Sequence, residues 1–460
     1  MKKLVMLVLS VFVGLALVAC TNATTEDTQT ATTTTTTTTT TVTTTGEEDY
    51  VQGVTDTTIK VGNTAAVSGA FAVVGIPFND AIKAVFKQVN DAGGIGGRTI
   101  EFVTYDDQFN AELGVTYTEQ LVEDDEVFAL VGHFGTPTVG ATLSYIQEQG
   151  VPMVYAATGI NSLYFEETPG NPIMAVQPIY LTDGRIMTAR AFQESLYGTN
   201  HDEALADTAK VGVLYTNDDV GNSIKAGVET EAAALGISAS RLVYIAVTAE
   251  TAVSAVAYLK AFNVSSVILA MNQAPFAYTL NAMYDAQLEV PVFTSYVNAD
   301  ITAVDHLKYS VDRPIYTNAW VDVYSTKGQE DVQAYIACIS NADLDEATKT
   351  AYYGNSFAIA GYIAATVFVE GLKRVDAAGL DLTWANYIAM MEDGPISIPM
   401  GGVVDFSNGH RWGIASMSLL QYTYGLGDNP ATTDVTETDY LTEAFVKIRE
   451  IETISEIEAK

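Results

Sequence analysis

The chain has 460 residues, and its 56 acidic against 22 basic residues give a formal net charge of −34. This acidity argues against a nucleic-acid partner, because binding to phosphates depends on basic contacts. Two cysteines and four scattered histidines are too few and too dispersed to indicate a metal site, and no motif indicates another cofactor.

The first 19 residues have the pattern of a secretory signal, because Lys2 and Lys3 precede an apolar run that ends at Ala19. Leu17-Val18-Ala19-Cys20 resembles the bacterial lipobox, in which the cysteine becomes the lipidated first residue of the mature chain. An ordinary signal peptide that happens to end near a cysteine is the alternative. We interpret Cys20 as a lipidation site and expect a protein anchored to the cell membrane, on its outer face or in the periplasm.

Residues 20–56 include ten consecutive threonines, Thr32 to Thr41, and almost no large apolar side chains. Such a segment cannot offset the entropy lost on ordering, and we expect it to form a mobile tether. The chain that follows is too long for one core, which indicates two lobes. No stretch after residue 19 approaches a membrane span in our interpretation, so we expect a soluble body.

A first series of elements begins with a predicted strand at 59–65 and a helix from Pro77 to Ala92. The stretch AGGIGGR ends that helix, because glycine readily takes a positive φ angle. Predicted strands follow at 98–105, 127–132 and 151–156, with helices between them. Alternating strands and helices predict a parallel sheet covered by helices on both faces.

A second series has predicted strands at 209–215, 241–247, 265–271 and 290–296. A long predicted helix spans about Tyr353 to Val375, and two strand-like stretches around a turn lie between residues 401 and 425. The spacing of Leu441, Phe445, Ile448 and Ile451 predicts a helix at the C-terminus. The fold class is therefore α/β with two lobes, each a parallel sheet flanked by helices.

Asp106 and Asp107 follow a predicted strand, where the chemistry of α/β proteins is often located. Adjacent residues in an extended segment point to opposite faces, so the two carboxylates cannot share one substrate. The sequence also contains no GxSxG elbow and no HExxH helix. We therefore do not expect an enzyme such as a hydrolase.

Several stretches, in this order, resemble one family: IKVGNTAAVSGAFAVVG, VNDAGGIGGRTIEFVTYDD, LVEDDEVFALVGHFGTPT, VPMVYAAT and GVVDFSNGH. The chain resembles the type I extracellular solute-binding proteins of ABC transporters, in their branched-chain-amino-acid-binding group, over most of residues 57–425. The resemblance implies two lobes hinged by three crossovers. It places lobe 1 at 57–177 and 322–405, lobe 2 at 178–321 and 406–425, and an acidic extension at 426–460.

The resemblance also implies a function. A small polar solute, an amino acid or an amide-like compound, would be captured between the lobes by hinge closure and delivered unaltered to an ABC transporter permease. We expect the protein to act as a monomer. A ligand-sensing receptor component with the same fold is the alternative, because no residue separates delivery from sensing.

Family motifs imply the ligand-binding residues. In this family, hydroxyl and backbone amide groups at helix N-termini meet the ligand's carboxylate. The matching positions are the first-loop residues Ser68 and Phe71, the hydroxyl of Thr136, and the strand end Ala156, Ala157 and Thr158. A capping or turn role is the alternative for each hydroxyl, and we favour ligand contact for Thr136 and Thr158.

Other positions depart from the amino-acid-binding pattern. The acid that meets the ligand's ammonium is replaced at Val297 or Asn298, and Asp300 lies further along the chain. Aromatic positions of the pattern carry other side chains here, namely Val74, Val220, and Asn272 or Gln273. A buried ammonium without a carboxylate is costly. An amide, a nucleobase-like, an aromatic or another small polar ligand is therefore as plausible as leucine.

Three further positions are interpreted with the resemblance. Phe109 and Gly135 occupy the positions of a disulfide that is common in the family. His133 follows a strand and either lines the cleft or serves as a hydrogen-bonded scaffold residue. Trp320 falls near the second crossover, where it either packs the hinge or covers the ligand, and we favour packing.

Overall fold

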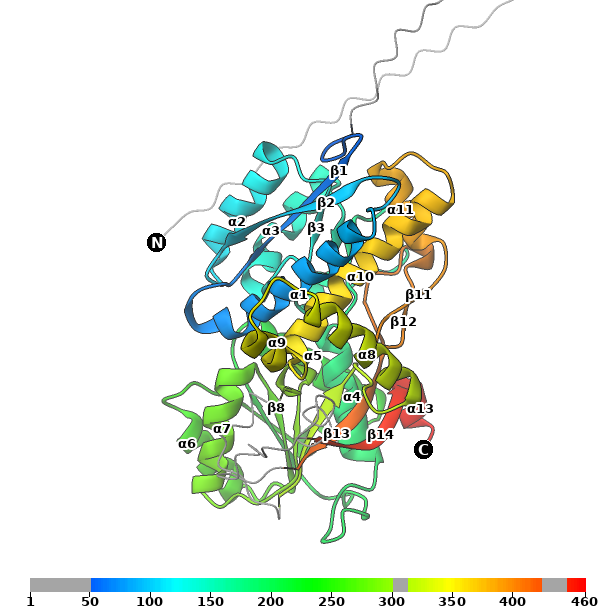
Figure 1. The fold of residues 1–460 in the computed structure, drawn as a ribbon. Coiled ribbons are helices and arrows are strands. Elements are labelled where there is room, and N and C mark those ends of the chain that lie inside the picture. Colours follow the sequence, from blue (N-terminus) through cyan, green and yellow to red (C-terminus); the bar gives the residue numbers. More distant parts are fainter. Residues whose placement is uncertain (1–50, 301–312, 424–444) are drawn as a thin grey trace, which may run out of the picture. The chain divides into compact units, whose positions relative to one another are not determined.

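The computed structural model describes residues 51–300, 313–423 and 445–460 (Figure 1). The chain divides into two units, Met1–Asp49 and Tyr50–Lys460, and all elements described below belong to the second. The predicted signal, Cys20, most of the tether and Leu441 lie outside the described residues.

The first sheet is parallel and has five strands in the order β2-β1-β3-β4-β5. Its strands are β1 (Thr58–Ala65), β2 (Thr99–Asp106), β3 (Ala129–Val131), β4 (Met153–Val154) and β5 (Ile173–Met174). The first four lie where the sequence predicts them. The glycines at 93, 94, 96 and 97 all have positive φ angles and form the expected turn before β2. The sequence analysis missed β5, which is only two residues long.

Seven of the described α-helices lie before β5 or within residues 326–392, and they belong to the lobe built on this sheet. They are α1 (Ala72–Asp91), α2 (Ala111–Glu119), α3 (Thr136–Gln149), α8 (Thr326–Ser340), α9 (Glu346–Tyr352), α10 (Ser356–Ala377) and α11 (Trp384–Glu392). The side chain of Asn110 accepts hydrogen bonds from two backbone amides and so begins α2, and Asn355 begins α10 in the same way.

Helices α1 and α10 lie side by side, as the blue and yellow helices in Figure 1 show. Gly361 makes this close approach possible, because a Cβ atom there would lie 2.0 Å from the carbonyl oxygen of Phe78. By length and composition α10 is apolar enough to cross a membrane, contrary to our expectation for the body. However, 61% of its most apolar window is buried inside the protein, as in the core helix of a soluble protein.

The second sheet has seven strands in the order β14-β13-β10-β9-β8-β6-β7. Its parallel part consists of β6 (Val211–Tyr215), β7 (Leu242–Ala246), β8 (Ser266–Ala270), β9 (Val292–Thr294) and β10 (Ile315–Ala319). Helices α4 (Tyr180–Gln193), α5 (Asp219–Ala234), α6 (Ala252–Ala261) and α7 (Gln273–Asp285) connect and cover these strands. The parallel strands of this sheet lie in the order β7-β6-β8-β9-β10, in which the second strand along the chain lies at the edge beside the first. The first sheet, β2-β1-β3-β4-β5, has the same order.

The last two strands of this sheet differ from the prediction. Strands β13 (Ser416–Tyr422) and β14 (Phe445–Thr453) are antiparallel to their neighbours, so this lobe is not a purely parallel sheet. The predicted C-terminal helix through Phe445, Ile448 and Ile451 is wrong, because these residues form β14. The open edge of β13 offers backbone hydrogen bonds to the segment, and this tertiary contact overrides its helical spacing. Only the short helix α13 (Ile454–Glu458) follows.

Within the described residues the chain passes between the two sheets three times: after β5, after β10, and between the short hairpin β11 (Ile396–Ser397)–β12 (Val403–Val404) and β13. These passages support the predicted three crossovers. The exact lobe boundaries, 57–177 with 322–405 and 178–321 with 406–425, remain our proposal.

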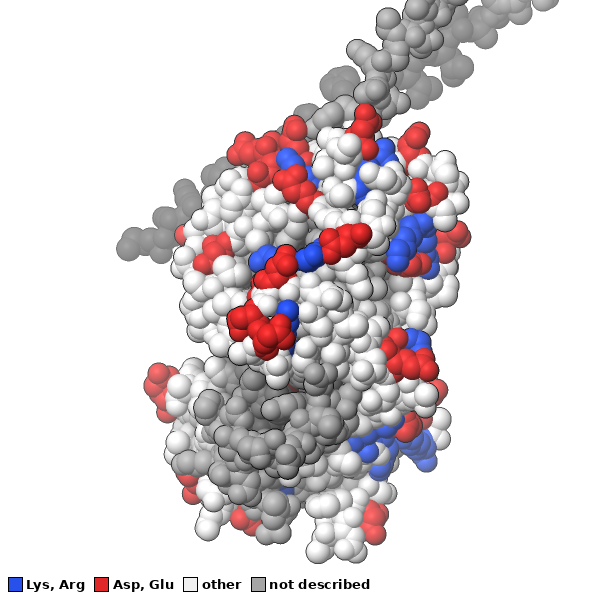
Figure 2. All heavy atoms as spheres, in the orientation of Figure 1, with Lys and Arg blue, Asp and Glu red and all other residues white. Residues whose placement is uncertain are grey.

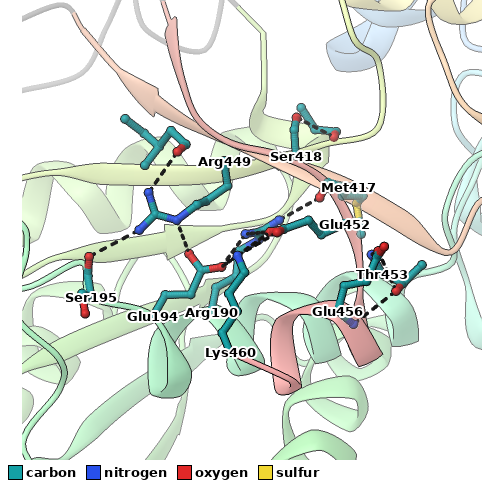
Figure 3. A network of polar contacts seen from close by, with 12 residues as sticks. Arg190, Glu194, Ser195, Met417, Ser418, Arg449, Glu452, Thr453, Glu456 and Lys460 are labelled. Carbon is teal, nitrogen blue, oxygen red and sulfur yellow. Dashed lines mark hydrogen bonds and ion pairs between the residues drawn. The ribbon is translucent and has the colours of Figure 1, made fainter.

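A network of charged side chains fastens the C-terminal strand to α4 (Figure 3). Arg190, which is fully buried, donates to Glu194 at 2.8 Å and to Glu452 of β14 at 3.1 Å. Arg449 pairs with Glu194 at 2.9 Å, and the terminal side chain of Lys460 bridges Glu194 and Glu452. Glu194 therefore joins three cations, which come from α4, from β14 and from the last residue of the chain.

Buried Asp183 connects α4 to β10. Its Oδ1 accepts a hydrogen bond from the side chain of Asn318 at 2.8 Å, while its Oδ2 has no partner among the described residues. Burial raises the pKa of Asp183 from 3.8 to about 7, although hydrogen bonds from Ser295 and Asn318 oppose this shift. The carboxyl group is therefore protonated in the folded protein at mildly acidic pH.

We predict that Glu194→Gln weakens the attachment of β14. Its hydrogen bonds to charged partners stabilise the fold by roughly 1.5–3 kcal/mol, and the free energy of unfolding should fall by this order. Hydrogen exchange of the amides in 445–453 should also accelerate. The control is Glu450→Gln, whose side chain is 76% exposed and pairs only at the surface with Lys447. Equal stability and exchange in the two variants would contradict the structural role of the network.

We predict that Asp183→Asn changes the pH dependence of stability. Because the folded pKa is raised, the stabilisation of the protonated group is complete below about pH 4 and is lost as pH rises towards 7, by on the order of 1.4 kcal/mol per pH unit. The variant should therefore be more stable than the wild type at pH 8 and similar to it at pH 4. Chemical denaturation at both pH values measures this, and parallel pH profiles would refute it.

Candidate functional site

A cavity of about 170 Å³ lies where the loops that follow strands of the two sheets meet. The first sheet contributes residues after β1, β3 and β4, and the second contributes residues after β8, β9 and β10. The order of both sheets reverses direction beside their first strands. Ligands of open α/β sheets bind at the carboxyl ends of strands near such a switch point.

Aromatic side chains form much of the cavity wall. Phe71 and Phe109 stack with their ring centroids 3.9 Å apart, and Tyr180 stacks on Tyr296 at 6.0 Å. The aromatic residues among the 29 that line the cavity are Phe71, Phe78, Phe109, Phe134, Tyr155, Tyr180, Tyr296, Trp320, Tyr324, Phe357 and Phe445. Such surfaces favour ligands that present an apolar or aromatic face.

The carboxylates of Asp106 and Asp107 hold the loop that carries Phe109. Gln108 and Phe109 have φ angles of 55° and 59°, which side chains of this size rarely adopt. The amide of Gln108 donates to Asp106 at 3.1 Å, and that of Phe109 donates to Asp107 at 2.9 Å. Both acids therefore position the local backbone, and neither contact resembles a catalytic pair.

The second oxygen of Asp107 accepts hydrogen bonds from Thr64 at 2.8 Å and from Thr138 at 2.6 Å. Gly135 completes this arrangement, because a Cβ atom there would lie 3.0 Å from the ring of Phe109. The two positions that the resemblance assigns to a disulfide are therefore neighbours, and an aromatic ring fills the space between them.

The hydroxyl groups on one side of the cavity are partners of one another. Thr136 and Thr158 lie 2.7 Å apart at their Oγ1 atoms, and both also interact with the hydroxyl of Tyr180. Burial raises the pKa of Tyr180 to about 12, so its hydroxyl stays protonated. A ligand that bonds to any of these hydroxyls competes with an existing contact.

Tyr155 is the exception among the buried hydroxyls of the wall. Its side chain is fully buried and lines the cavity, and its hydroxyl has no hydrogen-bond partner in the part of the chain that the structure describes. Its φ angle of 60° places it at a sharp turn directly after β4. Burial raises the pKa of Tyr155, so the hydroxyl remains able to donate.

Asp300 lines the cavity, although the sequence pattern placed it beyond the family's acid. Its carboxylate accepts hydrogen bonds from the backbone amide of Ser356, at 3.0 Å, and from the Ser356 hydroxyl. These bonds place a negative charge at the first residue of α10, which the helix dipole favours. Because Asp300 belongs to the second sheet's loops and α10 packs on the first lobe, this contact also joins the two lobes.

The predicted ligand-binding residues fall into two groups. Phe71, Thr136, Ala157 and Gln273 line the cavity. Five others do not: Ser68, Ala156, Thr158, Val220 and Asn298. Ser68 is exposed, and the other four are buried. Thr158 contacts the lining residues Thr136 and Tyr180, while Asn298 donates to the backbone of Met271 and to Thr294. Ligand contact by any of these nine residues stays a prediction.

His133 is a scaffold residue rather than part of the cavity wall. It is fully buried, and its ring nitrogens contact the amide of Thr64 at 3.4 Å and the hydroxyl of Thr118 at 3.1 Å. Trp320 does line the cavity and also packs near Tyr155, with 6.4 Å between ring centroids. The sequence analysis favoured a packing role for Trp320 and did not predict that its side chain also lines the cavity. Among the described residues no group of three or more His, Cys, Asp or Glu side chains is arranged to hold a metal ion.

Comparison with known proteins identifies the family. The family model described as "Periplasmic binding protein" matches residues 58–428. The chain belongs to the periplasmic binding protein family. This family is made of extracytoplasmic solute-binding proteins and not of enzymes, in agreement with the sequence prediction.

One curated relative is the Leu/Ile/Val-binding protein homolog 1 of Brucella abortus, which is 29% identical over 170 residues. That match covers 36% of this chain and 41% of the relative, so it spans about two fifths of the relative's length.

Solved structures share the fold at low identity. The fatty acid ABC transporter substrate-binding protein from Thermomonospora curvata has a TM-score of 0.65 at 19% identity and covers 89% of this chain and 96% of its own. A branched-chain amino acid ABC transporter protein from Thermus thermophilus with bound valine has a TM-score of 0.63 at 15% identity, covering 88% and 100%. The type I periplasmic-binding-protein fold predicted from the sequence is confirmed.

We predict that Asp107→Ala destabilises this periplasmic binding protein by about 3 kcal/mol, because two buried hydroxyls and one amide lose their shared acceptor. The loop at 108–110 should also exchange its amide hydrogens faster. Glu101→Ala, at an exposed position on the preceding strand β2, serves as the control and should change stability by less than about 0.5 kcal/mol. Equal denaturation midpoints for the two variants would contradict the positioning role of Asp107.

Proposed function

We propose that the protein is the solute-binding component of an ABC importer. It captures a small solute in the cavity between its two lobes and presents it, unaltered, to a membrane permease. One observation carries this proposal: in a member of the periplasmic binding protein family, loops from both sheets enclose one cavity at the carboxyl ends of their strands. A ligand held there contacts both lobes and therefore favours their closed arrangement.

The side chains that line the cavity change the ligand that we expect. The sequence indicates a small polar solute, either an amino acid or an amide-like compound, whereas the cavity wall is mainly apolar and aromatic. The named relatives and neighbours include proteins for leucine, isoleucine and valine, for valine, and for fatty acid. We propose a ligand with an apolar body and few polar groups.

We further propose that a lipid on Cys20 and the threonine-rich tether keep the protein near its permease. A short flexible tether raises the effective concentration of one partner near the other. The net charge of −34 agrees with a role outside nucleic-acid binding. On the face drawn in Figure 2, acidic and basic side chains lie in small mixed groups.

We predict that Phe71→Ala weakens binding of the native solute about ten-fold or more. Loss of a stacked aromatic wall residue removes roughly 1.5–3 kcal/mol of apolar contact. Native mass spectrometry of freshly purified protein identifies the co-purified solute, and calorimetry with that solute measures the affinity. Val73→Ala is the matched control, because Val73 lies two residues away, is 74% exposed and does not line the cavity.

Small-angle scattering with and without the solute tests closure. A smaller radius of gyration with solute, together with its recovery unchanged, is the expected result. Chemical conversion of the solute, or a solute that binds equally well to the Phe71 and Val73 variants, would contradict the proposed site and function.

A further inference from the structure

Asp300 and Ser356 bring the two lobes into direct polar contact away from the three crossovers. Asp300 follows β9 of the second sheet and is 2% exposed, while Ser356 is the first residue of α10, which packs on α1 in the first lobe. The Asp300 carboxylate accepts hydrogen bonds from the Ser356 amide, at 3.0 Å, and from the Ser356 hydroxyl. Because neither residue belongs to a crossover, a hinge rotation that parts the lobes also parts this pair.

Each partner of the contact is fixed to its own lobe. In the second lobe, Tyr422 of β13 donates to the carbonyl of Asn298, and the Asn298 side chain donates to the carbonyl of Met271 at 3.1 Å, which fixes the loop just before Asp300. In the first lobe, α10 lies against α1 at Gly361, where a Cβ atom would meet the backbone of Phe78. The contact therefore joins two well-packed bodies and reports on their relative position.

The first turn of α10 divides its free amides between the lobes. The side chain of Asn355, in the same lobe as the helix, accepts from the amides of Phe357 and Ala358 at 3.0 and 2.9 Å. The amide of Ser356 instead donates to Asp300 of the other lobe. A helix N-terminus favours a carboxylate, because its free N–H groups carry partial positive charge. Asn355 holds the start of α10 by itself, so the helix does not need Asp300 in order to form.

The physical chemistry of the contact suits a reversible connection. A hydrogen bond to a charged group is stronger than one between neutral groups, which favours the closed arrangement. The carboxylate must lose its water when it is buried, which favours the open arrangement. These two contributions oppose each other, and a ligand that contacts both lobes can then shift the balance.

We propose that Asp300 and Ser356 form a latch between the lobes, which is made on closure and broken on opening. The latch sets the closed fraction of the protein without solute and the rate at which a bound solute leaves. Apparent affinity falls in proportion to the fraction of protein that is competent to hold the ligand. The inference rests on the proposed solute-binding function and adds to it a pair of positioning residues that act through closure.

Small-angle scattering of the solute-free protein tests the latch without any ligand. Asp300→Ala should increase the radius of gyration relative to the wild type, because the closed arrangement loses both hydrogen bonds. Ser356→Ala should increase it less, because the backbone amide still donates. A radius of gyration that is the same in the wild type and in Asp300→Ala would overturn the latch.

Release of the solute identified by native mass spectrometry gives a second readout. Stopped-flow measurements should show release at least ten-fold faster in Asp300→Ala and at least three-fold faster in Ser356→Ala. Ser356→Ala should add nothing in the Asp300→Ala background, because the hydroxyl acts through that carboxylate. Faster release in Asp300→Ala with an unchanged solute-free radius of gyration would assign Asp300 to the solute itself and overturn the latch.

Asn355→Ala is the matched control for an effect on the helix alone. It removes the cap that α10 receives from its own lobe, so the melting temperature should fall. The rate of solute release and the solute-free radius of gyration should keep their wild-type values. If Asn355→Ala instead reproduced both changes of Asp300→Ala, the effect would come from the stability of α10, and the latch would be refuted.

The wild type separates the latch from the function on which it rests. A wild type that binds its solute and closes, with Asp300 and Ser356 variants that behave identically to it, overturns the latch and leaves the solute-binding function standing. A wild type that retains no solute, and whose scattering curve responds to none of leucine, isoleucine and valine, overturns the function and the latch together.

Discussion

The convergence of strand ends on one edge is the constraint on which the rest of this molecule depends. Both sheets place five parallel strands in the same order, so the loops after neighbouring strands come together at one edge of each sheet. Those loops are free to carry any side chain, because the hydrogen bonds of the sheets do not involve them. Much of the ligand cavity wall, and Asp300 in its contact with Ser356 of α10, comes from these loops.

The loops around the cavity are fixed by buried polar contacts rather than by regular structure. Asp106 and Asp107 hold the strained backbone at Gln108 and Phe109, and Gly135 leaves room for the Phe109 ring. A rigid aromatic wall loses little entropy when a ligand binds, so more of the contact energy remains available for affinity. Asp106 and Asp107 thus contribute to ligand binding indirectly, because they fix the shape of the cavity wall at Phe109.

The C-terminal segment contributes to the same site. Strand β14 extends the second sheet, and its first residue, Phe445, lines the cavity beside Tyr324, whose hydroxyl donates to the Phe445 carbonyl at 3.3 Å. The ion pairs of Arg190, Glu194 and Glu452 hold the other end of the strand on α4 (Figure 3). Residues 445–460, the described end of the predicted acidic extension, are therefore part of the body that forms the cavity.

The sequence by itself determined the α/β class, the two series of elements and the turn at the glycines, because these depend on short-range periodicity and on turn chemistry. It also indicated the loops that carry Phe71, Thr136, Ala157 and Gln273. Only the tertiary structure decided that Phe445 belongs to a strand, that Trp320 and Tyr155 line the cavity, and that Asp300 binds Ser356 of α10. Those outcomes depend on contacts between segments far apart in the chain, and side-chain spacing along one segment carries no information about them.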